Sequence, residues 1–158
     1  MASVKIKKER LGELLQGWSR ERVIFVPSKD EGLTAFEEWN SSDTDFVNWY
    51  RNTVKPPKAL FFPPMEEMFS FQKDESGYHM EQPVAERKRL IFGIRPCDAR
   101  GLTILDRLFE ELYPDPYYRP RTQIIQQVAM GCNRPYDTCF CTSMGIDPAE
   151  SADVDLML

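Results

Sequence analysis

The sequence predicts an α/β fold, in which a mixed, partly parallel sheet of five or six short strands is flanked by helices. The main evidence is a strand–helix–strand crossover over about residues 90–131. The run Leu90–Ile94 is apolar on both faces, as in a buried parallel strand. A helical stripe of leucines follows it, and Gln123–Gly131 forms a second strand-like run. We therefore expect two parallel neighbouring strands joined by one helix.

The length and composition indicate one soluble globular domain. A chain of 158 residues is long enough to bury a core without staples. No apolar run approaches the ~20 residues of a membrane span, and the first residues lack a hydrophobic signal region. We therefore expect a cytoplasmic protein with no membrane insertion. The net charge of −5 argues against nucleic-acid binding, which depends on clustered lysine and arginine.

The N-terminal third is predicted to contain a helix and a strand. Apolar residues from Val4 to Trp18 recur at roughly helical spacing. Arg22–Pro27 is a short run typical of a strand, and we expect the strand to stop at the proline. Residues 28–52 show a mixed pattern. Their large aromatic side chains are expected in the core: Trp39, Phe46, Trp49 and Tyr50.

The middle of the chain is marked by two Pro-Pro pairs that bracket the apolar tetrad Ala59–Phe62. Proline fixes φ and donates no hydrogen bond, so we expect the tetrad to be a short strand. Pro64 suits the first turn of a helix. That helix would carry apolar side chains that fit either core packing or a face for docking a partner: Met65, Met68, Phe69 and Phe71.

A further strand is predicted over residues 77–83, after a glycine turn. It carries His79, the single histidine of the chain. An isolated histidine in such a segment is usually an ordinary surface or core residue, and we do not expect it to bind metal. The run 153–158 predicts a last strand. Because a domain seldom ends on an apolar strand, we expect the chain to be the front piece of a longer protein.

The crossover places Cys97 where the first strand ends and its helix begins. We expect Asp98 to cap this helix, and residues 115–120 to form a loop after it. Ligand sites of α/β folds lie at such strand ends, and a helix N-terminus lowers the pKa of a thiol. The second strand delivers Cys132 at its end. In a parallel pair, Cys97 and Cys132 would therefore emerge at the same sheet edge.

All four cysteines lie in the C-terminal part of the chain: Cys97, Cys132, Cys139 and Cys141. Four thiolates complete the shell of one iron–sulfur cluster or one structural zinc. The spacing matches neither the ferredoxin run nor paired C-x₂-C zinc knuckles. Zinc, unmetallated thiols with Cys97 reactive, and a disulfide between Cys132 and Cys139 remain alternatives. No P-loop, Gly-x-Ser-x-Gly or Gly-x-Gly-x-x-Gly motif indicates an enzyme active site.

Residues 53–158 resemble a known family. They are similar to the iron–sulfur beta subunits of soluble nickel–iron hydrogenases (sulfhydrogenases) and to the corresponding iron–sulfur component of anaerobic sulfite reductase. Similar proteins accompany heterodisulfide-reductase-type complexes. The segments that carry the resemblance are Pro56–Phe71, Arg95–Phe109, Asp115–Tyr118 and Cys132–Gly145, and the most specific are Cys139–Gly145 and Cys97-Asp98 with Ile104–Phe109.

The resemblance implies a non-catalytic electron-transfer component of a multisubunit anaerobic oxidoreductase. Its partners would be other subunits, of hydrogenase, flavin or ferredoxin type. It also implies one [4Fe–4S] cluster held by the four cysteines. Family members normally carry a C-terminal region with two C-x₂-C-x₂-C-x₃-C runs, and this sequence has neither. Residues 1–158 are therefore expected to be a single domain from the N-terminal part of such a subunit. The alternative is a non-redox docking domain with structural cysteines, either metal-free or holding zinc.

Overall fold

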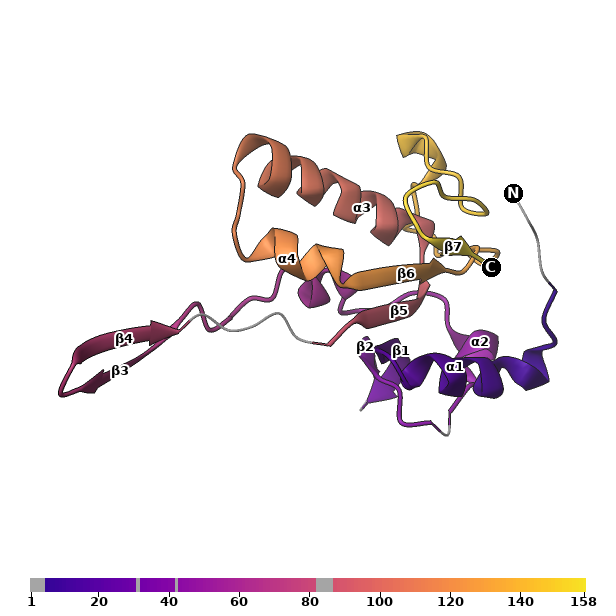
Figure 1. Cartoon of the computed structure of the whole chain (residues 1–158). Helices are drawn as coiled ribbons and strands as arrows, with labels where there is room; N and C mark the ends of the chain where they lie inside the picture. The colour runs from indigo at the N-terminus through magenta and orange to yellow at the C-terminus, as the bar shows by residue number, and fades with distance from the viewer. Residues whose placement is uncertain (1–4, 31, 42, 82–86) are drawn as a thin grey trace.

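The computed structural model describes residues 5–30, 32–41, 43–81 and 87–158 (Figure 1). A five-stranded sheet has the order β2-β1-β5-β6-β7. β2 is antiparallel to β1, whereas β1, β5, β6 and β7 pair in parallel. The predicted α/β class and mixed, partly parallel sheet are confirmed. The strands are β1 Val23–Asp30, β2 Leu33–Glu38, β5 Arg89–Ile94, β6 Ile125–Ala129 and β7 Leu156–Met157.

Helices cover both faces of this sheet. Figure 1 shows α1 and α2 below the sheet and α3 above it, with α4 leading into β6. Tyr118 of α4 packs in the same hydrophobic core as α3. A π-helical segment, η3, continues α3, and short 3₁₀ turns occur elsewhere. The bounds are α1 Leu11–Ser19, α2 Phe46–Trp49, α3 Pro96–Asp106, η3 Arg107–Leu112 and α4 Tyr118–Gln123, with 3₁₀ turns η1 Lys8–Arg10, η2 Pro57–Leu60 and η4 Thr142–Met144.

Strand β5 separates two hydrophobic cores. Leu90 and Phe92 pack with the α1 and α2 residues, while Ile91 packs with α3 and α4. Alternate side chains of a strand point to opposite faces, so a strand covered on both sides must be apolar throughout. The expected core aromatics Trp39, Phe46 and Tyr50 are buried. Trp49, also expected in the core, is half-buried and packs against it.

Strand β5 ends in a bend at Gly93. Its φ is +96°, and the β5–β6 register shifts between Phe92 and Ile94. A Cβ at this position would lie 3.3 Å from two ring carbons of Pro27 and 3.4 Å from Met130 Sδ. Only glycine combines this backbone conformation with so close an approach. The bend sets the direction in which the chain leaves the sheet toward Cys97.

Gly93→Ala is expected to lower the free energy of unfolding by roughly 2 kcal/mol, because a side chain at positive φ costs about 1–2 kcal/mol and the Pro27 ring must also move. Urea unfolding of the metal-free protein measures it. The control is Gly17→Ala inside α1, where a Cβ would meet nothing within 4 Å. We expect that variant to be as stable as the parent or up to about 1 kcal/mol more stable. Equal effects of the two substitutions would contradict the bend.

In the N-terminal third, the predicted helix is shorter and the predicted strand longer than expected. Val4 lies outside the described residues, residues 5–7 are not helical, and the α-helix begins only at Leu11. Strand β1 does not stop at Pro27 but runs on to Asp30. β1 pairs with β5 only over Val23–Phe25, so Pro27 removes no hydrogen bond from that pairing. Strand β2 lies in the stretch whose pattern was mixed.

The predictions for residues 59–71 were wrong. Ala59–Phe62 is not a strand, because the amides of Phe61 and Phe62 both bond back to the carbonyl of Lys58 in the turn η2. Proline at the start of that turn suits helical rather than extended backbone. No helix follows Pro64; residues 65–69 are irregular and lead into a strand. Their methionines and phenylalanines are exposed, so the core-packing interpretation was wrong as well.

A second sheet, formed by one hairpin, stands apart from the main body (Figure 1). It consists of β3, Ser70–Asp74, and β4, Gly77–Glu81. The predicted strand at 77–83 is confirmed over its described part, since residues 82 and 83 lie outside the described residues. His79 is on this hairpin, where its Nε2 contacts Ser76 Oγ at 2.7 Å. It is a surface residue far along the chain from the cysteines.

The helix after β5 also differs from expectation. It begins at Pro96, so Arg95 rather than Asp98 occupies the N-cap position. The π-helical turn of η3 breaks the apolar stripe, and Leu108 and Leu112 are exposed. The expected loop at residues 115–120 holds the start of α4. Among the described residues, none of the helices is both long and apolar enough to cross a bilayer.

Candidate metal centre

The topology brings all four cysteines to one pocket. Because β5 and β6 are parallel, the segments that follow them leave the sheet at the same edge, and the amide of Met130 bonds to the carbonyl of Ile94 at 3.0 Å. The expected shared edge for Cys97 and Cys132 is therefore confirmed. The loop after Cys132 folds back over this edge. The pocket is lined by Cys97, Cys132, Cys139 and Cys141 together with Arg51, Asn52, Arg95, Pro96, Arg134, Pro135, Tyr136 and Pro148.

Cys97 and Cys141 are neighbours in the pocket. Burial, the Asp98 carboxyl group and the nearby Cys141 thiol raise the pKa of Cys97 to about 12. The expected lowering by the helix N-terminus was wrong for the free thiol, because the cost of desolvating a thiolate here is larger. All four cysteines are free thiols in this structure. Without a metal or cluster, Cys97 stays protonated and unreactive at neutral pH.

Cys139 and Cys141 lie on a loop that is ordered by its own backbone. The amide of Tyr136 donates to Cys139 Sγ at 3.2 Å, and the amide of Cys139 donates to the carbonyl of Tyr136 at 3.0 Å. The carbonyl of Cys141 accepts the amides of Met144 and Ile146, both at 3.0 Å. Cys139 is exposed, whereas Cys141 is half-buried.

The backbone at Cys132 is hydrogen-bonded to residues close to the C-terminus. Its amide donates to the carbonyl of Pro148 at 2.7 Å, and the amide of Gly131 donates to the carbonyl of Leu158 at 2.9 Å. The short strand β7 thus fixes the backbone immediately before the first cysteine of the loop. The predicted last strand is confirmed, although only Leu156 and Met157 form it.

Arg95 is buried beneath the pocket and ties three segments together. Its guanidinium donates to the carbonyls of Tyr50 at 2.6 Å and Arg51 at 2.8 Å. It also donates to those of Met130 at 3.1 Å and Gly131 at 2.7 Å. The group lies 4.4 Å from the centroid of the Tyr50 ring. The sequence places Arg95 two residues before Cys97, but no pattern in it predicted a role for Arg95.

Arg51 holds the next part of the loop. Its Nε donates to the carbonyl of Arg134 at 3.1 Å and its Nη2 to that of Pro135 at 2.5 Å. The guanidinium carbon lies 4.1 Å from the centroid of the Tyr136 ring. Arg51 therefore fixes the turn that leads to Cys139. Nothing in its sequence surroundings indicated this role.

Arg51→Ala is expected to loosen this loop, because it removes two hydrogen bonds and one cation–π contact. Hydrogen–deuterium exchange of peptides covering residues 133–140 should become at least about tenfold faster, since about 1.4 kcal/mol corresponds to one factor of ten. Arg134→Ala is the matched control, because Arg134 is exposed and its carbonyl stays available. Equally fast exchange in both variants would contradict the assigned role of Arg51.

The charge around the pocket is unusual. Arg95 is 5% exposed, and all four of its hydrogen bonds go to backbone carbonyls. Within the described residues, no ion pair joins its guanidinium to a carboxylate within 4 Å. Asp98 is nearby; burial raises its pKa to about 6, so it is still mostly a carboxylate at neutral pH and partly balances the Arg95 charge. Because Arg51 and Arg134 also line the pocket, positive charge remains in excess, and the pocket suits a negatively charged occupant.

All four cysteines line the pocket. Among the described residues, no group of three or more histidine, cysteine, aspartate or glutamate side chains is arranged to hold a metal ion. A tetrahedral zinc needs four sulfurs within about 2.3 Å of a single atom. A four-iron cluster takes one thiolate at each of its irons, so its ligands need not converge. Four cysteine thiols are the donor set of such a cluster and equally that of a structural zinc.

No family model and no solved structure matches the chain. A curated protein does: Sulfhydrogenase 2 subunit beta of Pyrococcus furiosus is 33% identical over 147 residues. The chain is similar to a hydrogenase beta subunit over almost its whole length. The match covers 93% of this chain but 42% of the relative, so the chain spans less than half the length of this relative. The resemblance to sulfhydrogenase beta subunits is confirmed, and that to sulfite reductase and heterodisulfide reductase assemblies stays a prediction.

Proposed function

We propose that this chain is an electron-transfer domain of a hydrogenase-type multisubunit oxidoreductase whose catalysis lies in another subunit. One [4Fe–4S] cluster is held by Cys97, Cys132, Cys139 and Cys141. The observation that carries the proposal is that all four cysteines line one pocket. The pocket lies above a buried arginine whose hydrogen bonds all go to carbonyls.

The charge of the site supports this occupant. Four thiolates bring more negative charge than the irons and sulfides balance, and Arg95 and Arg51 supply positive charge beside them. When bound, the cluster supplies a one-electron carrier whose potential depends on net charge and on hydrogen bonds to its sulfurs. Arg95 holds the backbone on both sides of the pocket. The amide of Tyr136 stabilises negative charge on Cys139 Sγ.

The relative supports the proposed setting. Its name makes it one subunit of a sulfhydrogenase, and a protein of this kind requires partner chains. We infer that this chain works beside hydrogenase, flavin or ferredoxin-type subunits. Assemblies like sulfite reductase or heterodisulfide reductase would use the same domain in the same way, because an electron carrier does not depend on the final acceptor.

A second candidate is a non-redox docking domain with structural cysteines. One feature favours it: burial raises the pKa of Cys97 to about 12, so this half-buried thiol stays protonated in the metal-free protein. In this case the pocket would hold no metal, or a zinc ion after the four sulfurs had moved together.

The experiment is anaerobic expression with iron and cysteine supplied, followed by measurement of iron, zinc and acid-labile sulfide per chain. The proposal expects about four irons and four sulfides, with a brown colour. One zinc per chain, or no metal in a protein that unfolds cooperatively, would instead leave the docking domain as the function.

A further inference from the structure

The β3–β4 hairpin has one apolar and one polar face. Its register pairs Phe71 with Met80 and Lys73 with Tyr78. Residues two apart on a strand share a face, so these four side chains lie together. The Lys73 ammonium sits 5.4 Å from the centroid of the Tyr78 ring. The pair between them, Gln72 and His79, belongs to the opposite, polar face.

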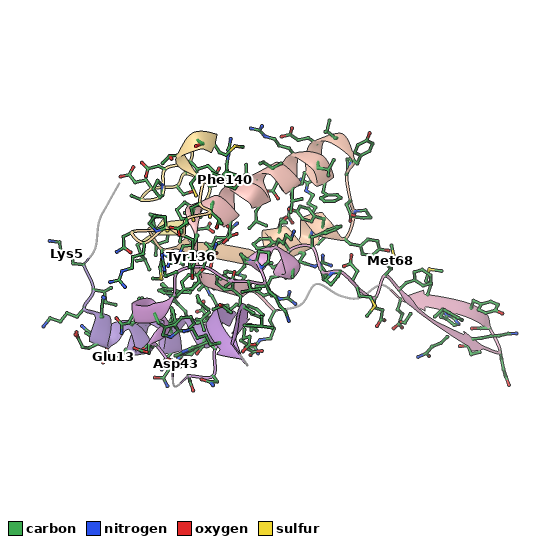
Figure 2. All side chains as sticks on the ribbon, turned by 180° about the vertical axis from the view of Figure 1, so that it is seen from behind. Lys5, Glu13, Asp43, Met68, Tyr136 and Phe140 are labelled. Carbon is green, nitrogen blue, oxygen red and sulfur yellow. The ribbon has the colours of Figure 1, made fainter. Side chains whose placement is uncertain are left out.

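The apolar face is open to solvent. Phe71 is 64% exposed, Tyr78 72% and Met80 69%. The chain that leads into the hairpin adds more exposed apolar side chains, with Met65 at 89%. Figure 2 shows the hairpin extending away from the body, with Met68 near its base. None of these residues belongs to either hydrophobic core.

Such a hairpin needs a covering surface. An isolated two-stranded hairpin is at best marginally stable in water, and it gains stability when an apolar face is packed. Among the described residues, β3 and β4 pair only with each other, so the main sheet gives them no support. A contiguous exposed apolar patch of this kind marks an interaction site.

Charge identifies the kind of occupant. Residues 65–81 carry five carboxylates, Glu66, Glu67, Asp74, Glu75 and Glu81, against the single ammonium of Lys73. Because Glu66 is ion-paired with Arg121 of α4, the net charge of −4 on this segment leaves −3 to face a partner. A second copy would bring the same negative segment against the first, and an anionic lipid surface would repel it too. The complementary surface is apolar with a basic rim.

We propose that the β3–β4 hairpin is a docking arm for a different protein chain, which receives Phe71, Tyr78 and Met80 in an apolar site rimmed by lysine or arginine. In the setting of the proposed function, on which this identity of the partner rests, that chain is another subunit of the oxidoreductase. The arm lies apart from the cysteine pocket, so docking and cluster binding can be tested separately (Figure 2).

The test is photo-crosslinking in cells of the source organism, in the full-length protein, with p-benzoylphenylalanine in place of Tyr78. Tyr113, which is also 72% exposed but follows η3 on the main body, is the matched control position. We expect the probe at position 78 to form a crosslink to a different protein chain, at an apolar site with a basic rim. The probe at position 113 should not form this crosslink. Crosslinking to a second copy, to the same chain or to nothing would overturn the proposal.

A pair of variants checks the face. Met80→Asp places a carboxylate on the apolar face, and Gln72→Asp places the same charge on the polar face. Co-purification of the crosslinked chain should fall at least tenfold with Met80→Asp and stay near the parent level with Gln72→Asp. Equal losses, or none, would overturn the assignment. Iron per chain should be the same in both variants and the parent. If the parent protein contains no iron but still docks, that result would contradict the proposed cluster and not the docking arm.

Discussion

Replacing Cys97 or Cys139 by serine is expected to abolish binding of most of the iron. Each substitution removes one of four thiolates, and a serine hydroxyl stays protonated where a thiol releases its proton on binding iron. We expect iron and acid-labile sulfide per chain to fall from about four each to below about one in both variants. Anaerobic reconstitution followed by iron and sulfide assays makes the measurement.

The control for this prediction is His79→Ala, which removes another residue type able to bind metal but lies on the hairpin. Its iron content should equal that of the parent. In metal-free protein, Cys139→Ser should change the free energy of unfolding by less than about 1 kcal/mol, because Cys139 is exposed. An unchanged iron content in the serine variants would remove both cysteines from the ligand set.

Arg95→Met is expected to destabilise the metal-free protein by about 3–5 kcal/mol, as when one partner of a buried charged network is removed. Methionine fills similar space but donates no hydrogen bond, so four carbonyls lose their donor at once: those of Tyr50, Arg51, Met130 and Gly131. The bond to Tyr50 is buried and the other three are partly buried, so the mutant recovers only part of the lost free energy from water. Urea unfolding followed by circular dichroism measures the loss.

The matched control is Arg100→Met in α3. Its guanidinium makes a partly exposed ion pair with Asp153 at 3.6 Å, and such pairs contribute about 0–1 kcal/mol. Arg95→Lys separates charge from geometry, since lysine keeps the positive charge but lacks the planar fork. We expect it to recover less than half of the loss. A loss below about 1 kcal/mol for Arg95→Met would show that the guanidinium does not hold the three segments.

The part of the fold that was predictable depends on local pattern. Apolar residues on both faces mark the run Leu90–Ile94 and the strand before Cys132 as buried strands. Their parallel pairing places Cys97 and Cys132 at one edge of the sheet. Residues 56–71 were unpredictable for the opposite reason. Phe69 and Phe71 fit a helix or a strand equally well, and only the pairing of Phe71 with Met80 decides between them.

The cysteines of the candidate site were predictable from the sequence, but the residues that hold them in place were not. The four cysteines stand out because of their residue type. The roles of Arg51 and Arg95 depend on carbonyl groups, which every residue has, so no sequence pattern marks them. The raised pKa of Cys97 was missed because its position at a helix start was visible in the sequence, whereas its burial was not.

The contacts of Arg95 set an order of events in biogenesis. Its four carbonyl partners lie between 35 and 45 positions away along the chain. Two of these partners directly follow β6 and the other two follow α2, so the junction forms only after β5 has paired with β6 and α2 has packed. The cavity between the cysteines then exists only in nearly native protein. Iron and sulfide would enter an already folded chain, and maturation would depend on access through the exposed Cys139 side rather than on nucleation of the fold by metal.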